Sequence, residues 1–132
     1  MDEQDEEAIP VEFRFVKDPR DLIVYKKAYA VSMKIHKTTL TFPKIEQFAL
    51  GDQLRKSSKS ICANVAEGFG KQEYSTAEFS RFLAMAEGSA IETQVWLQYA
   101  HDLQYINKEQ YTEWNREYFS IKAMLYKLRK SL

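Results

Sequence analysis

The residues of this 132-residue chain that could do chemistry are two histidines and one cysteine. Neither His36 nor His101 follows a glutamate at the Glu-x-x-His spacing that di-metal helical bundles use. No arginine precedes either histidine at the spacing typical of four-helix ribonucleases. Cys62 has no companion in the sequence that would activate a thiolate nucleophile. We therefore expect a non-enzymatic protein that uses no metal, cofactor or small-molecule substrate.

A polar cluster between two predicted helices is the strongest candidate for a site. Asn64 and Glu67 fall near the end of one helix and Arg81 near the start of the next, so Glu67 and Arg81 are expected to meet at the shared turn. The cluster consists of Asn64, Glu67, Gly68, Arg81, Ser89 and Glu92. Two interpretations stay open: a hydrogen-bonded clamp that fixes the turn, or a binding site at a boundary between subunits. A phosphate-binding loop is not expected around Gly68, because such a loop follows a strand and precedes a helix.

The formal net charge is zero, but the charges are unevenly distributed. Residues 1–21 contain eight acids and three bases, a net charge of −5, and the rest of the chain has a net charge of +5. Residues 1–20 are expected to form an acidic extension, which is either solvated or folded over a basic surface where it competes with a polyanion. The basic residues that could bind nucleic acid are Lys26, Lys27, Lys34, Lys37, Arg55, Lys56, Lys59 and Lys71.

Four helices are predicted to position these residues. They are expected to span residues 22–38, 45 or 52 to 67, 75–102 and 107–132. The second helix is expected to end where Gly68 and Gly70 adopt a left-handed backbone. The third and fourth helices each open with a capping box, Ser-x-x-Glu and Asn-x-x-Gln, in which two side chains and two backbone N–H groups pair reciprocally.

The apolar residues of these helices indicate how they pack. The last helix has an unbroken heptad pattern, formed by Tyr111, Trp114, Tyr118, Ile121, Leu125, Leu128 and Leu132. The first helix has a second stripe beside its core stripe, formed by Tyr25, Tyr29, Ser32 and His36. The third helix also has a second stripe, formed by Phe82, Met85, Ser89, Glu92, Trp96 and Tyr99, which covers more of its circumference than one core needs. The predicted fold of residues 21–132 is an all-α, antiparallel, up-down four-helix bundle.

Targeting features in the sequence are few. The acidic N-terminus is unlike a signal peptide, and no stretch resembles a membrane span. The single cysteine suits a reducing compartment. We therefore expect a cytoplasmic protein with no membrane partner.

Several segments together resemble one known family. They are DLIVYKKA at 21–28, FP at 42–43, QLRK at 53–56, SICANVAEG at 60–68 and GK at 70–71, followed by Phe79, Phe82, Leu83, Ala86, Gly88, Ser89 and Glu92. In this order and spacing they resemble the four-helix-bundle proteins encoded in intervening sequences of bacterial large-subunit ribosomal RNA. The resemblance covers about residues 21–108, and its departures are mild, such as Tyr25 where tryptophan is frequent. The acidic extension lies outside it.

The resemblance implies a homopentamer, in which five bundles form a barrel around a central pore. A related fold is the accessory variability protein of diversity-generating retroelements, a strongly basic pentamer that binds nucleic acid and a reverse transcriptase. The first functional hypothesis is therefore a homo-oligomeric scaffold or adaptor, associated with RNA or a ribonucleoprotein. The alternatives are a DNA- or RNA-binding accessory subunit of a reverse transcriptase and an uncharacterised enzyme that acts through Asn64, Glu67, Arg81 and Glu92. The mildly basic body of this chain favours the scaffold, because affinity for a phosphate backbone rises with the number of phosphates neutralised.

Overall fold

The structure, a computed structural model, describes residues 16–132. Four long helices account for most of this part of the chain, and it contains no strand. The long helices are α3 (Ile23–Thr39), α4 (Leu50–Lys71), α5 (Thr76–Asp102) and α6 (Lys108–Ser131). Two short 3-10 helices, η1 (Pro19–Asp21) and η2 (Lys44–Glu46), precede α3 and α4.

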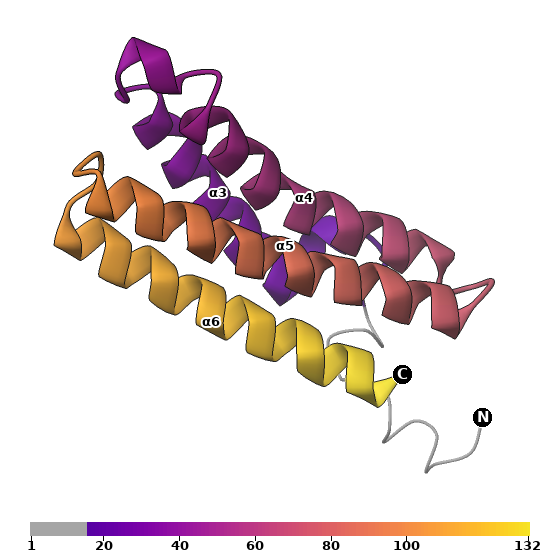
Figure 1. Ribbon diagram of the computed structural model, residues 1–132. Helices are drawn as coiled ribbons and strands as arrows, with labels where there is room; N and C mark the ends of the chain where they lie inside the picture. Colours follow the sequence, from indigo (N-terminus) through magenta and orange to yellow (C-terminus); the bar gives the residue numbers. More distant parts are fainter. Residues whose placement is uncertain (1–15) are drawn as a thin grey trace.

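Consecutive long helices lie side by side and run in opposite directions (Figure 1). α3 packs on α4, α4 on α5 and α5 on α6, and α6 closes the bundle by packing back on α3. α3 and α5 therefore occupy diagonal corners of the bundle. The predicted all-α four-helix bundle is confirmed. None of the long helices in residues 16–132 is long and apolar enough to cross a membrane.

α5 and α6 begin with side-chain caps at the predicted residues, whereas α3 and α4 begin after Leu22 and Ala49 without one. At α6 both halves of the capping box form: the Gln110 amide N–H donates to Asn107 Oδ1 at 2.8 Å, and the Asn107 N–H donates to Gln110 Oε1 at 2.9 Å. At α5 the Glu78 N–H donates to Ser75 Oγ at 3.1 Å. The Glu78 carboxylate does not complete the expected box but pairs with Arg81 at 3.0 Å. The Glu78 carboxylate therefore pairs with Arg81, one turn later on α5, and not with the backbone N–H of Ser75.

The predicted end of the second helix is wrong. α4 continues through both glycines to Lys71, and no glycine in the described residues has a positive φ. Gly68 is needed for a different reason: a Cβ at this position would lie 2.7 Å from the Cβ of Phe82 and 3.1 Å from the Phe79 ring. Because these atoms belong to α5, the glycine allows α4 and α5 to approach closely.

The hydrophobic core lies along the bundle axis and uses the predicted core faces. The heptad positions of α6 from Trp114 to Leu128 are buried, whereas Leu132 is 43 % exposed at the end of the chain. Hydroxyl groups link the small residues between α4 and α5: Thr93 Oγ1 donates to Ser57 Oγ at 2.8 Å. The Tyr118 hydroxyl is buried and has no hydrogen-bond partner in the described part of the chain. The other buried polar side chains are the hydroxyl residues Ser32, Thr39, Ser57, Ser58 and Thr93, and the charged residues of the described chain lie at the surface.

Candidate functional site

The structure brings together only part of the predicted polar cluster. Asn64 Nδ2 donates to the Ser60 carbonyl at 2.9 Å, and the Ser60 hydroxyl lies 2.9 Å from the Ser89 hydroxyl. Asn64 and Ser89 are therefore linked through Ser60, across the seam between α4 and α5. This hydroxyl contact links α4 to α5 along their length, about three helical turns away from the turn that joins the two helices.

The other charged members of the cluster point elsewhere. Among residues 16–132 no hydrogen bond or ion pair joins Glu67 to Arg81, because Arg81 pairs with Glu78 one turn along its own helix. Glu67 is exposed. The Glu92 carboxylate accepts a hydrogen bond from Trp96 Nε1 at 3.3 Å on α5. The described geometry therefore does not assemble Asn64, Glu67, Arg81 and Glu92 into one constellation.

Three of the predicted nucleic-acid-binding lysines are paired with carboxylates. Lys27 lies 3.0 Å from Glu117, and Lys34 lies 3.2 Å from Glu113, so both cross from α3 to α6. Lys56 pairs with Asp52 one turn earlier on α4, at 2.9 Å. Ion pairs at or near the surface, as these are, contribute little to stability. They do lower the positive charge that these lysines offer to a phosphate backbone.

Arg55 supports the turn between α3 and α4. Its Nη1 donates to Thr39 Oγ1 at 2.9 Å, and its Nη2 donates to the Gln47 carbonyl. Gln47 Nε2 in turn donates to the carbonyls of Thr39, at 2.8 Å, and Phe42, at 2.9 Å. The turn is thus tied to both helices, although it presents Phe48 to solvent at 91 % exposure. Arg55 acts here as a structural residue.

The remaining predicted basic residues are spread over the bundle. Lys59 Nζ lies 2.9 Å from His36 Nδ1. Lys71 lies over the Phe82 ring, 5.7 Å from its centroid. Lys26 and Lys37 are exposed on α3 and have no charged partner among residues 16–132. The eight residues therefore do not form one continuous free basic stripe.

The two histidines and the cysteine lie in three separate environments on α3, α5 and α4. Partial burial, with the nearby charges of Lys59 and Arg55, lowers the pKa of His36, so a neutral ring accepts the Lys59 hydrogen bond. His101 stacks on Tyr111 with ring centroids 4.8 Å apart. Burial raises the pKa of the Cys62 thiol to about 11, which disfavours the reactive thiolate. Within the described residues no three His, Cys, Asp or Glu side chains gather where they could hold a metal ion.

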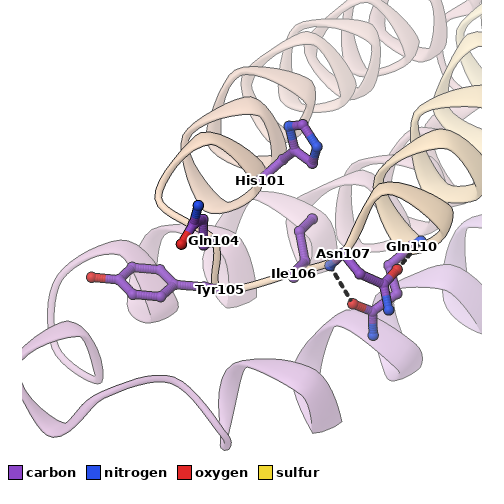
Figure 2. Close-up of a pocket in the computed structure, with 6 residues that line it drawn as sticks. All are labelled: His101, Gln104, Tyr105, Ile106, Asn107 and Gln110. Carbon is purple, nitrogen blue, oxygen red and sulfur yellow. Dashed lines mark hydrogen bonds between the residues drawn. The ribbon is translucent and has the colours of Figure 1, made fainter.

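A hollow at the turn between α5 and α6 is lined by polar groups (Figure 2). The lining residues are His101, Gln104, Tyr105, Ile106, Asn107 and Gln110. Gln104 has a φ of 65°, a left-handed conformation that lets the chain leave α5 and turn toward α6. Asn107 and Gln110 already form the capping box, as the dashed lines in Figure 2 show. The polar residues of this hollow mainly have structural roles: Gln104 lies in the turn after α5, and Asn107 and Gln110 cap the start of α6.

An exposed apolar surface extends over α5 and α6. We call it the α5–α6 face and define it as Met85, Ile91, Val95, Tyr99, Phe119 and Tyr126, each of which is at least 43 % exposed. The two helices beneath it are joined by hydrogen bonds from Arg129 Nε to Glu87 Oε2 at 2.6 Å and from Gln94 Nε2 to Asn115 Oδ1 at 3.0 Å. Ile91 and Val95 are one turn apart on α5, and Phe119 and Tyr126 are two turns apart on α6, so each pair lies on one side of its helix.

The sequence indicated this surface only in part. The second stripe predicted for the third helix includes Met85 and Tyr99, which are exposed, but it omits Ile91 and Val95. Phe119 and Tyr126 were not predicted to be exposed, because the core heptad of the same helix dominates its apolar pattern. Their seven-residue spacing outside the heptad positions is the signal that could have placed them on a second, exposed side of the helix.

Comparison with known proteins places the chain in a family. A comparison with curated proteins finds no match. One similar solved structure is a protein of unknown function from the S23 ribosomal protein family of Bacteroides thetaiotaomicron. It is 29 % identical to this chain, covers 82 % of this chain and 99 % of its own, and superposes with a TM-score of 0.71. The model of the 23S rRNA-intervening sequence protein family matches residues 20–127. The predicted resemblance is confirmed: the chain belongs to the 23S rRNA-intervening sequence protein family.

Proposed function

We propose that this protein is a non-enzymatic scaffold whose working unit is a homo-oligomer, a pentameric ring as the family resemblance implies. The observation that supports this proposal is the α5–α6 face. Phe119 is 57 % exposed and Ile91 is 53 % exposed, on a bundle whose core is otherwise well filled. Large contiguous apolar patches on a folded domain mark places where another molecule binds.

A contact between copies at the α5–α6 face would be stabilised by the apolar area that it removes from water. Burying apolar surface contributes about 25 cal/mol per Å², and a stable protein interface buries roughly 800 Å² on each partner. Five side chains of this face provide the apolar centre of such an interface, whereas Met85 lies about 120° around α5 from Ile91. The ring of five is the assembly that the family resemblance suggested.

The absence of catalysis is part of the same proposal. The charged groups of the polar cluster do not converge within the described residues, and the Cys62 thiol is held in its neutral form. The hydroxyl groups at the seam between α4 and α5 bond one another. These contacts support structural roles for the residues that could otherwise do chemistry.

An RNA titration separates the scaffold from a nucleic-acid-binding accessory subunit. Because three candidate lysines are paired with carboxylates and Arg55 supports a turn, few phosphates would be neutralised, and we expect weak binding with a shallow salt dependence. Fluorescence anisotropy with a labelled single-stranded RNA and a hairpin RNA should give dissociation constants of about 10⁻⁴–10⁻⁶ M at physiological salt, the range of non-specific binding. A constant in the nanomolar range would favour the accessory subunit instead.

A further inference from the structure

Two basic side chains meet where α3 packs on α4. Lys59 Nζ lies 2.9 Å from His36 Nδ1, and neither group has a carboxylate partner among residues 16–132. Because an ammonium group has only donors, Lys59 donates and the neutral His36 ring accepts. The ring then carries its own proton on Nε2, and Lys59 keeps two further N–H groups. In the described part of the chain no side chain or carbonyl accepts from these three N–H groups, so they are available to a ligand.

The other side of α3 shows how this bundle neutralises lysines elsewhere. Where α6 packs on α3, lysines of α3 are paired with glutamates of α6: Lys27 with Glu117 and Lys34 with Glu113. Where α4 packs on α3, the charged groups that act on His36 are the cations Lys59 and Arg55. Partial burial of the ring and these two charges lower the pKa of His36. A negative charge would be stabilised on this side of α3, and the described residues supply none there.

We propose that His36 and Lys59 form a binding site for a phosphate monoester group, which is either inorganic phosphate or the terminal phosphate of a nucleotide or RNA. A tetrahedral oxyanion has several acceptor oxygens, so one ligand can accept from a donor of α3 and a donor of α4 at the same time. The inference goes beyond the proposed function and does not depend on the oligomeric state, because both residues belong to one bundle.

The charge of the ligand matches the charge that the two side chains can carry together. A phosphate monoester has a charge of about −1.5 to −2 at pH 7, whereas a chloride ion has a single charge. Lys59 supplies one positive charge, and His36 supplies a second when it takes up a proton. In the free protein that second charge is disfavoured, because the ring lies against the Lys59 ammonium group. A phosphate held by both groups removes this penalty, so its binding should raise the pKa of His36.

The test follows the ring protons of both histidines by NMR as the pH of the full-length protein is changed. It compares sodium phosphate with sodium chloride at equal ionic strength, which removes the general effect of screening. A few charge-assisted hydrogen bonds can supply a dissociation constant of about 1 mM. Saturating phosphate should move the midpoint of the His36 titration up by about one pH unit, which corresponds to about tenfold tighter binding to the protonated ring. His101, beside Asp102 at the end of α5, is the internal control, and its signal should respond equally to the two salts.

Three variants test the role of Lys59. Lys59→Gln should raise the His36 midpoint in chloride, because a neighbouring cation is lost, and should abolish the further rise in phosphate. Lys59→Arg keeps the charge and the donors and should retain the response to phosphate. The matched control is Lys37→Gln, which removes an exposed lysine next to His36 in the sequence and should also retain it. The proposal is overturned by an unchanged His36 midpoint in phosphate, by an equal response of His101, or by a full response in Lys59→Gln.

Two RNA ligands identify the source of the phosphate group. A short single-stranded RNA with a 5′-phosphate and the same RNA with a 5′-hydroxyl are each titrated against the protein in chloride. If only the 5′-phosphorylated RNA raises the His36 midpoint, the site takes a terminal phosphate. If inorganic phosphate raises it and neither RNA does, the site takes free phosphate. Equal responses to the two RNAs would contradict the assignment, because the site would then bind the phosphodiester backbone and not a monoester.

Discussion

Replacing Ile91 and Phe119 together by lysine is expected to convert the assembled protein into a folded monomer. Both side chains are more than half exposed in the bundle, so the substitutions leave the core of each subunit intact. In the assembly the same positions would be buried, and an unpaired ammonium group there must give up its water. With a loss of about 2 kcal/mol or more at each position, typical of central interface residues, the dissociation constant should rise roughly 1,000-fold.

Light scattering after size exclusion gives the mass, and far-ultraviolet circular dichroism checks the helices. The matched control is Tyr74→Lys, which adds one charge at another exposed aromatic residue, in the turn between α4 and α5. The control should keep the mass of the unaltered protein. If the double variant also kept that mass, the α5–α6 face would not be the surface that holds the copies together.

Replacing Gly68 by alanine is expected to destabilise the protein by about 1–3 kcal/mol, the usual cost of forcing an extra methyl group into a packed contact. The new Cβ would approach the Phe82 Cβ to 2.7 Å. That atom is close to the α5 backbone and cannot swing aside, so α4 and α5 must separate. The loss should appear as a lower midpoint of urea unfolding.

Gly70 supplies the control on the same helix. A Cβ there would have no atom within 4 Å, so Gly70→Ala should leave stability unchanged or raise it by up to about 1 kcal/mol through helix propensity. Both variants should be compared at several protein concentrations, because assembly makes the apparent stability concentration-dependent. Equal losses for the two variants would show that the glycines matter for the helix end and not for the packing of α5.

The sequence predicted the parts of the fold that depend on local rules. The number of helices, the capping box at Asn107 and the buried heptad around Tyr118 and Leu125 all follow from neighbours along the chain. The end of α4 could not be predicted in this way. A glycine pair usually ends a helix, but at Gly68 the reason for glycine is the Phe82 side chain, which belongs to another helix.

The site was harder to predict than the fold, because its contacts depend on the register between helices. Glu67 and Arg81 were expected to meet across a turn, yet Glu78 is a nearer partner for Arg81 and needs less ordering of side chains. Lys27 and Lys34 were predicted to be free to bind nucleic acid, but the packing of α6 on α3 pairs each of them with a glutamate of α6. Of the α5–α6 face, the sequence indicated only Met85 and Tyr99, because the exposed apolar residues Phe119 and Tyr126 share a helix with an unbroken core heptad.

The mass of the unaltered chain in solution tests the central claim most directly. Sedimentation equilibrium over a wide range of protein concentrations should give one species of about five times the 15.5 kDa chain mass, with dissociation only at the lowest concentrations. A single species of 15.5 kDa at every concentration would contradict the account, because the α5–α6 face would then remain in water with no second copy to cover it.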